Sequence, residues 1–396
     1  MEYFRQIGYQ TVFGPDVLPE GVNPLRGDVR QVILPQNVKN ALVRLNPGVP
    51  QAVLDEAYQL LANPSEATLI ARNETIYHYL TDGIKICHKT ATGEDTATDV
   101  KIVDFNNPAN NEFLAVNQFA VQGPVNLRRP DIVVFLNGLP IAVVELKNPS
   151  NEKTDVSAAY NQIQTYKTDI PDLFNYNLAC ILSDGVVARI GSLSANEERY
   201  MPWRTLHGEK RTQETEHEAE ILIKGFFDKA QLLDFLQYFV VFEADKSKTI
   251  KKIAGYHQFF AGRKTVESVL RALNAHSNKG GVVWHTTGSG KSLSMVCIAH
   301  KIMSSPAMKN PTIVMVTDRN ELDTQLFNTF AQCVPELAPV AAVSRETLQT
   351  LLKNKPSGGV IFTTMQKFLP ENGADTYPML SDRSNIVVIS DEDHRT

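Results

Sequence analysis

The stretch that decides the fold of the C-terminal part of the chain is His285-Thr286-Thr287-Gly288-Ser289-Gly290-Lys291-Ser292. An apolar run, Val282-Val283-Trp284, precedes it, and the apolar spacing of a helix follows from Lys291 to Ile302. A strand, a glycine-rich turn and a helix in this order are the context that a phosphate-binding loop requires. Glycines allow the tight turn that points backbone N–H groups and the helix N-terminus at a phosphate. The sequence therefore predicts a nucleotide site.

The polar side chains of this loop have separate expected roles. We expect Lys291 to reach the β- and γ-phosphates of ATP and the Ser292 hydroxyl to hold Mg²⁺. The common form of the loop begins with glycine, and His285 stands at that position here. A Gly/Ser loop with a surface lysine is the plain alternative, and the strand–loop–helix order argues against it. The residues that we expect to bind ATP in this loop are Thr287, Gly288, Ser289, Gly290, Lys291 and Ser292.

Short apolar strands and helical segments alternate around the loop, which predicts a parallel sheet with helices on both faces. The last predicted strand is followed by Asp391-Glu392-Asp393-His394, and carboxylates at such a strand end lie beside the phosphate loop. We expect Asp391 to hold Mg²⁺ through water and Glu392 to orient and deprotonate the attacking water. An acidic surface loop is the alternative. Strands are predicted at 281–285, 312–317, 360–363 and 385–390, and helices begin at 291 and 321.

The sequence before residue 245 has the pattern of a compact mixed α/β domain, whereas residues 1–50 predict no definite fold. The polar stretch 208–219 predicts a surface loop and the basic stretch 245–252 a connector. We therefore expect one domain at 1–245 and a second at 246–396. Helices are predicted at 51–61, 73–80, 155–167 and 229–243, and strands at 101–105, 113–122, 131–136, 141–147, 178–183 and 186–190.

Two of these strands form a predicted hairpin that carries charge at one end. With a three-residue loop at 137–139, Asp131 lies directly opposite Glu145, and the strand period of two puts Lys147 on the same face as Glu145. A strict two-residue turn at Asn137-Gly138 turns Asp131 to the other face, so an odd loop or a bulge is needed.

The rest of the hairpin is apolar, so a cluster of Asp131, Glu145 and Lys147 is costly unless it binds something. Two carboxylates suit Mg²⁺, which prefers oxygen ligands. A metal there polarises a scissile phosphate, while Lys147 positions or activates the attacking water. A charged end on an ordinary hairpin is the alternative.

Gln162 and Tyr166 stand four residues apart on the next predicted helix, hence on one face. Pro130-Asp131…Glu145-Leu146-Lys147 followed by this pair resembles the PD-(D/E)xK nuclease domain of the R (restriction and translocation) subunit of type I restriction enzymes. Asn73-Glu74 and Asn117-Gln118-Phe119 are also similar to that domain. The resemblance implies that Asp131, Glu145 and Lys147 are catalytic, with the two carboxylates as metal ligands. It further implies that Gln162 and Tyr166 support DNA backbone contact and that Glu74 contributes to the metal region.

The second part resembles the first RecA-like domain of superfamily 2 helicases and translocases, through its phosphate loop and the Asp-Glu-x-His box at 391–394. Segments 316–322 and 363–368 resemble the DNA-contacting motifs of that family. Tyr256-His257-Gln258 resembles its glutamine motif, which implies that Gln258 reads adenine. Asp393 departs from the small residue usual in the box, and its extra negative charge near the metal bears on coupling and turnover.

Together these resemblances imply an R subunit that translocates DNA with ATP and cuts both strands with Mg²⁺. The implied partners are double-stranded DNA and the modification (methyltransferase) and specificity subunits. A stand-alone nuclease–helicase of repair or phage defence is the first alternative, and gene neighbours distinguish the two. An inactive fragment is the second, because such motors need a further RecA-like domain and the sequence stops at Thr396. In that case we expect weak ATP binding and little hydrolysis.

The net charge of −5 gives no overall attraction to nucleic acid, so DNA contact must come from local basic surface. Candidates are Arg128-Arg129 and the lysines at 246, 248, 251 and 252. Four scattered cysteines fit neither a zinc site nor a disulfide framework and suit a reducing cytosol. With no secretory signal or apolar membrane span, we expect a cytoplasmic protein.

Overall fold

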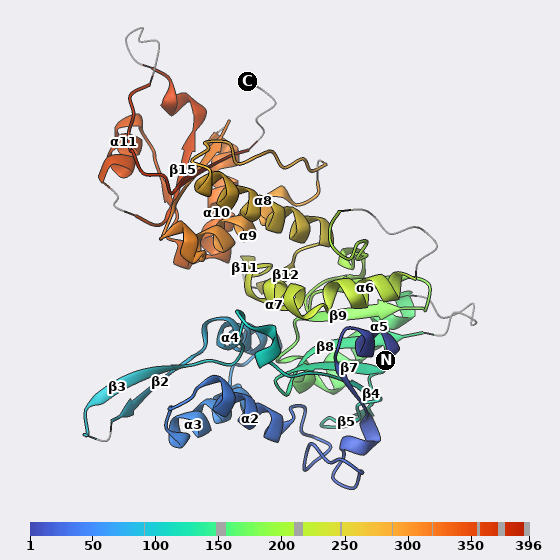
Figure 1. Cartoon of the computed structure of the whole chain (residues 1–396). Helices are drawn as coiled ribbons and strands as arrows, with labels where there is room; N and C mark the ends of the chain where they lie inside the picture. The colour runs from blue at the N-terminus through green and yellow to red at the C-terminus, as the bar shows by residue number, and fades with distance from the viewer. Residues whose placement is uncertain are drawn as a thin grey trace. The chain divides into compact units, whose positions relative to one another are not determined.

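The computed structural model describes residues 1–90, 92–147, 156–209, 217–245, 248–286, 288–318, 320–354, 357–370 and 377–391 (Figure 1). The chain divides into two compact units. The first comprises Met1–Gln237 and Thr249–Tyr256, and the second Tyr238–Lys248 and His257–Thr396. The expected boundary between 245 and 246 falls within a two-stranded sheet of β11 (Val240–Asp245) and β12 (Lys248–Ile253), through which the division runs.

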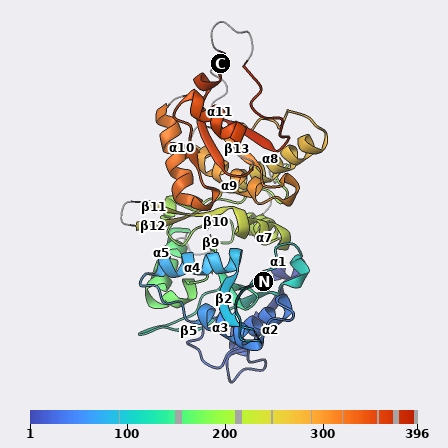
Figure 2. The ribbon, with the colours of Figure 1, turned by 90° about the vertical axis from the view of Figure 1, so that its left-hand side faces the viewer.

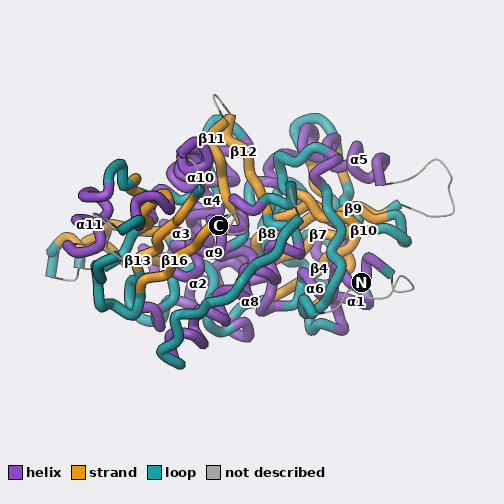
Figure 3. The backbone as a smooth tube through the Cα atoms, turned by 90° about the horizontal axis from the view of Figure 1, so that it is seen from above, coloured by secondary structure: helices purple, strands orange, loops and turns teal. Residues whose placement is uncertain are grey.

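The first unit is built on a six-stranded mixed sheet of order β1-β4-β7-β8-β9-β10. Figure 3 shows β4, β7, β8 and β9 side by side. The β1–β4 and β8–β9 pairs are parallel and the others antiparallel. The strands are β1 (Gln10–Phe13), β4 (Phe113–Asn117), β7 (Ile132–Leu136), β8 (Leu139–Leu146), β9 (Ala179–Ser183) and β10 (Ala188–Gly191).

Helices cover this sheet, and as a result every residue of β7 is buried. Helix α5 packs on β8 and β9. Short two-stranded sheets pair β2 (Ile84–Lys89) with β3 (Asp95–Val100) and β5 (Val121–Gln122) with β6 (Leu127–Arg128). The helices are α1 (Glu2–Gln6), α2 (Pro35–Leu45), α3 (Gln51–Ala62), α4 (Leu69–Asp82), α5 (Val156–Asp169), α6 (Glu218–Phe226) and α7 (Lys229–Tyr238).

The predicted strand at 101–105 is wrong. Asn46 accepts the backbone N–H of Lys101 through Oδ1 and donates Nδ2 to its carbonyl, at 2.7 and 2.8 Å. The backbone of Lys101 is therefore bonded by a side chain rather than by a neighbouring strand. The strand predicted at 113–122 is broken between β4 and β5, where Gln118 has a φ of 55°.

Two further predictions around the unit boundary are wrong. The helix predicted to reach residue 243 ends at Tyr238, because the β-branched and aromatic run Val240-Val241-Phe242 forms β11 instead. The stretch predicted as a connector at 245–252 contains β12. Of the loop predicted at 208–219, residues 210–216 lie outside the described residues, and α6 already begins at Glu218.

The second unit contains the predicted parallel sheet, in the order β14-β15-β13-β16, with helices on both faces. Ile313 and Met315 pack into a core with α9 and α10, whereas Val314 and Val316 face a second core with α11. Figure 2 shows these three helices around β13. The elements are α8 (Tyr256–Asn274), α9 (Lys291–Met303), β13 (Thr312–Thr317), α10 (Asn320–Cys333), β14 (Val340–Ala341), α11 (Arg345–Asn354), β15 (Val360–Thr364) and β16 (Ile386–Ser390).

The strand predicted at 281–285 is not formed. This segment pairs with no described strand, and Val282 and Trp284 are 90% and 89% exposed. An apolar run becomes a strand only where a neighbouring strand accepts its backbone hydrogen bonds. The helix after the loop begins at Lys291 as predicted. Among the described residues, no helix has the length and apolarity needed to span a bilayer.

Candidate functional site

The β7–β8 hairpin aligns the charged residues as expected, although by a different route. Its turn has the two residues Asn137 and Gly138, with φ of 50° and 82°, and Leu136 pairs with Leu139. Of the two expected routes, an odd loop or a bulge, the structure therefore has the bulge and not the three-residue loop. A register shift between Val134 and Phe135 supplies the odd residue, so that Ile132 pairs with Val144. The β-bulge thus aligns Asp131, the residue before β7, with Glu145, the residue after Val144.

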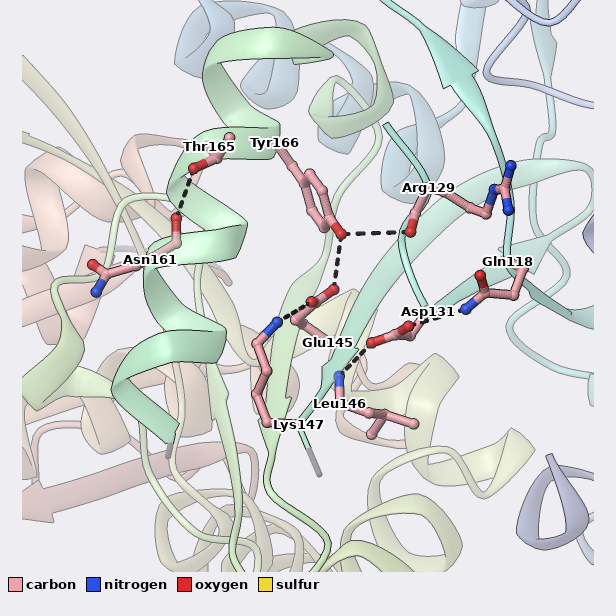
Figure 4. A network of polar contacts seen from close by, with 9 residues as sticks. All are labelled: Gln118, Arg129, Asp131, Glu145, Leu146, Lys147, Asn161, Thr165 and Tyr166. Carbon is pink, nitrogen blue, oxygen red and sulfur yellow. Dashed lines mark hydrogen bonds and ion pairs between the residues drawn. The ribbon is translucent and has the colours of Figure 1, made fainter. Parts of the chain in front are cut away.

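Asp131 lies at this open end with both carboxylate oxygens hydrogen-bonded (Figure 4). Oδ2 accepts the backbone N–H of Leu146 at 2.8 Å, and Oδ1 accepts the side-chain amide of Gln118 at 3.0 Å. The backbone N–H of Gln118 also donates to the Asp131 carbonyl at 2.8 Å. The orientation of the Asp131 carboxylate is therefore set by two donors, one at the end of β8 and one directly after β4.

Glu145 has two donors of its own. Its side chain is 5% exposed; Oε1 lies 2.6 Å from Lys147 Nζ, and Oε2 accepts the Tyr166 hydroxyl at 3.1 Å. Burial raises the pKa of Glu145, Lys147 and Tyr166 oppose this effect, and the nearby charge of Asp131 adds to it. Figure 4 shows the two carboxylates as neighbours, with Lys147 and Tyr166 on the side of Glu145.

Tyr166 and Gln162 are on α5, and the structure brings both to the site. The Tyr166 side chain is buried, and burial together with Glu145 raises its pKa far above the usual range, while a hydrogen bond with Gln162 lowers it. The hydroxyl of Tyr166 is thus directed at a carboxylate inside the protein. The role in DNA backbone contact that the resemblance implies for Gln162 and Tyr166 stays a prediction.

Glu74 does not join this pair. It is half-buried on α4, where burial raises its pKa. Among the described residues, no group of three or more His, Cys, Asp or Glu side chains is placed to hold a metal ion, and the contribution of Glu74 to the metal region stays a prediction. Two carboxylates still fit Mg²⁺, because this ion is often bound through one or two carboxylates and completes its shell with water and phosphate oxygens.

The basic residues proposed for DNA contact have different surroundings. Arg128 forms an ion pair with Asp169 at 2.5 Å, whereas Arg129 is exposed. Lys251 is 2% exposed and donates to Asn73 Oδ1 at 2.9 Å, so it is unavailable to DNA. Lys246 lies outside the described residues.

In the second unit the phosphate loop ends where α9 begins. Gly288 and Gly290 have φ of 80° and 81°, which the tight turn requires. The Ser289 hydroxyl is buried and has no hydrogen-bond partner among the described residues. An unpartnered donor in a glycine-rich turn before a helix N-terminus fits a phosphate group. Thr287 lies outside the described residues.

Two residues of α8 hold the backbone of this loop. Gln258, which is buried, donates its amide to the Gly290 carbonyl at 2.9 Å. His257 Nε2 lies 3.2 Å from the Ser289 carbonyl, and its ring meets the His285 ring edge-on at a centroid distance of 5.6 Å. Burial, and then the charges of His257 and Lys291, lower the pKa of His285. Gln258 therefore contacts the loop as well as being the residue expected at adenine.

Asp391 follows β16, and its backbone N–H donates to the Val316 carbonyl at 2.9 Å. It therefore lies at the C-terminal edge of the sheet, as expected for a carboxylate of the nucleotide site. Gln366 donates to the Asp318 carbonyl at 3.2 Å, which joins the two segments that resemble DNA-contacting motifs. Arg319 and residues 392–396, including Glu392, lie outside the described residues.

Sequence reasoning did not assign Gln118 to the site. The available signal was a polar residue directly after the apolar run Phe113–Asn117, but its position next to Asp131 depends on a backbone turn that spacing does not predict.

Comparison with known proteins agrees with this geometry. Residues 1–199 match the family model described as "Type I restriction enzyme R protein N terminus", and residues 257–396 match "SWI2/SNF2 ATPase". The whole chain is 40% identical to the HindI type I restriction enzyme endonuclease subunit of Haemophilus influenzae, over 38% of that protein. The whole chain is also 33% identical to a Methanocaldococcus jannaschii protein that is named as the endonuclease subunit of the type I restriction enzyme MjaIXP. The match covers 39% of the length of that protein. The chain thus spans less than two fifths of these relatives.

Proposed function

The chain belongs to the family of type I restriction enzyme R proteins, and from this premise we propose that its first unit is a Mg²⁺-dependent DNA nuclease and its second an ATP-dependent DNA translocase domain. The observation that carries the nuclease proposal is the placement of Asp131, Glu145 and Lys147 together at the open end of one hairpin. The proposed activity is hydrolysis of a phosphodiester in double-stranded DNA.

Asp131 and Glu145 are the proposed metal ligands. When bound, Mg²⁺ polarises the scissile phosphate and stabilises the leaving oxygen. Glu145 must be ionised to serve as a ligand, and its contact with Lys147 at 2.6 Å favours the ionised form in a buried setting. Lys147, in contact with this carboxylate, would donate to the attacking water and so position it.

The proposed nucleotide site uses the loop at the start of α9. Lys291 contacts the β- and γ-phosphates, the backbone of Thr287, Gly288, Ser289 and Gly290 cradles them, and Gln258 lies at the adenine. Ser292 and Asp391 hold the Mg²⁺ of the nucleotide, and Glu392 orients the attacking water. The buried Ser289 hydroxyl, which has no hydrogen-bond partner among the described residues, supports the proposal that a phosphate binds at this position.

The relatives are named as endonuclease subunits of type I restriction enzymes, so a stand-alone repair nuclease–helicase is not favoured. We place the chain in a cytoplasmic complex with modification (methyltransferase) and specificity subunits, acting on double-stranded DNA.

The test is plasmid cleavage by the complete R subunit with its partner subunits, ATP and Mg²⁺. Asp131→Asn keeps the shape of the side chain and removes its charge, so cleavage is lost while DNA-stimulated ATP hydrolysis remains. Lys291→Ala loses both activities. Asp99→Asn, on the exposed side of β3, is the matched control and cuts normally. Normal cutting by Asp131→Asn refutes the nuclease assignment.

A further inference from the structure

We propose that Gln118 is a positioning residue of the nuclease site, whose side-chain amide holds the Asp131 carboxylate in the orientation that accepts a divalent cation. This inference rests on the proposed function of Asp131. The Gln118 amide donates to Asp131, so the proposed role is exerted through that carboxylate.

The side chain of Gln118 donates its hydrogen bond to Asp131. A carboxylate only accepts, so the Gln118 atom that lies 3.0 Å from Asp131 Oδ1 is the amide nitrogen. With Leu146 N–H on the other oxygen at 2.8 Å, each oxygen of Asp131 has one donor and keeps a lone pair for a cation. Partners of this kind orient metal ligands before the metal binds.

The backbone of Gln118 has an unusual conformation. Its φ of 55° lies in the left-handed region, which a residue with a Cβ rarely adopts. Such a conformation persists where the surroundings impose it, and these conformations cluster at functional sites. It allows Gln118 to contact Asp131 twice, through the backbone N–H and through the side-chain amide. A residue needed only for the bend would be glycine, which adopts this φ without strain.

The bend at Gln118, between β4 and β5, is contacted by residues that are distant in the sequence. A Cβ on Gly14 would lie 2.1 Å from the Gln118 carbonyl oxygen, so only glycine fits at residue 14. Arg26 lies over the Phe119 ring at 3.8 Å and donates to the Ala120 carbonyl at 2.5 Å. The backbone of Gln118 and Ala120 and the ring of Phe119 are thus all contacted by residues outside this segment, which supports a fixed position of the Gln118 amide relative to Asp131.

The experiment is binding of Mn²⁺ to the 396-residue chain without nucleotide, measured by electron paramagnetic resonance in an Asp391→Asn background that removes the motor ligand. Gln118→Gly deletes the amide and relaxes the backbone, so its thermal stability is unchanged or higher. Its dissociation constant for Mn²⁺ rises roughly tenfold or more, the usual effect of losing such a partner. Gln122→Ala is the matched control, because the Gln122 amide donates to the Gly123 carbonyl instead.

Mn²⁺ binding by Gln118→Gly with wild-type affinity overturns this inference. Asp131→Asn separates that result from failure of the proposed function. If Asp131→Asn loses Mn²⁺ and Gln118→Gly does not, only the role of Gln118 is wrong. If Asp131→Asn also binds normally, the nuclease proposal and this inference both fail. In the complete enzyme, Gln118→Gly raises the Mg²⁺ concentration for half-maximal cleavage, and saturating Mg²⁺ restores most of the rate.

Discussion

The Tyr166 hydroxyl donates a hydrogen bond to Glu145 at 3.1 Å, on the carboxylate oxygen opposite the one that contacts Lys147. A helix residue is thereby coupled to a proposed metal ligand on a strand. Burial raises the pKa of Glu145, and the two donors limit that rise. Both donors therefore favour the ionised carboxylate that a cation needs.

Replacing Tyr166 with phenylalanine removes one donor and keeps the ring. The pKa of Glu145 then rises further, because the hydrogen bond from Tyr166 lowers it. Protons compete with the cation for Glu145, so the affinity for Mn²⁺ falls as the pH falls. In Tyr166→Phe we expect this fall in affinity to begin at a higher pH than in the wild type. At neutral pH we expect about a tenfold loss of affinity, the value of a hydrogen bond to a charged group. The measurement is the Mn²⁺ dissociation constant between pH 5 and 8.

Tyr160→Phe is the control for this prediction. Tyr160 is on the same helix, and its ring meets Tyr200 edge-on rather than the site. A pH dependence in Tyr166→Phe equal to that of Tyr160→Phe contradicts the coupling.

Replacing Lys147 with methionine leaves Glu145 buried without its cation. We expect the free energy of unfolding at pH 8 to fall by about 1–3 kcal/mol, the cost of an unsatisfied buried group. The folded state raises the pKa of Glu145, so at low pH the neutral carboxyl needs no cation and the deficit shrinks as the pH falls through that pKa. Urea unfolding, followed by the fluorescence of the buried Trp203, measures this.

Lys147→Arg keeps the positive charge beside Glu145 and is the control for the predicted fall in the free energy of unfolding. Equal stability of Lys147→Met and the wild type at pH 8 means that Glu145 is neutral there, which contradicts its role as a ligand.

The alignment of Asp131 with Glu145 could be predicted from spacing because strand period and hairpin pairing are local rules. Spacing could not decide between a three-residue loop and a two-residue turn with a bulge, because both give the same register. The bulge depends on packing along β8. The start of α9 at Lys291 followed from the glycine-rich turn. The absence of a strand at 281–285 did not follow, because pairing depends on a partner that is distant in sequence.

The contacts of buried polar residues were the least predictable part. Lys251 lies in a basic run that is typical of an exposed surface, yet it is enclosed with Asn73 and Asn177. Gln118 reaches Asp131 at a bend that Gly14 and Arg26, both distant in sequence, contact. Such contacts join residues far apart in the chain, and no local pattern specifies them.

Trp284 gives a direct measure of nucleotide binding, because its exposed indole lies immediately before the phosphate loop. ATP with Mg²⁺ should change its fluorescence by ordering the loop, whereas Trp203 is buried in the other unit. Lys291→Ala raises the ATP concentration for half the change by roughly tenfold or more, the loss expected for a charged contact. An unchanged response in Lys291→Ala rules out the phosphate contact, and Trp284→Phe shows that the signal comes from this residue.

Lys251 gives the first unit a distinctive dependence of stability on pH. Its ammonium donates to Asn73 Oδ1 and to the Asn177 carbonyl, at 2.9 and 2.5 Å, and burial lowers its pKa to about 7. An unfolded lysine titrates near 10.4, so between about pH 7 and pH 10 the unfolded chain binds more protons than the folded chain. The contribution of Lys251 to stability is therefore greatest above that range and is lost as the pH falls toward 7.

Lys251→Met removes this titration and the hydrogen bond to Asn73 Oδ1, while the Asn177 carbonyl still accepts the Asn73 side-chain amide at 2.9 Å. The free energy of unfolding of the wild type, minus that of the variant, should therefore rise steadily between pH 7.5 and 9.5, with a slope of at most about 1.4 kcal/mol per pH unit. Urea unfolding followed by Trp203 measures both proteins. Lys252→Met, at the next and partly exposed position, is the control and gives a shallower slope. A difference that stays constant over this range means that Lys251 is charged in the folded protein at pH 9, which contradicts the effect of its burial.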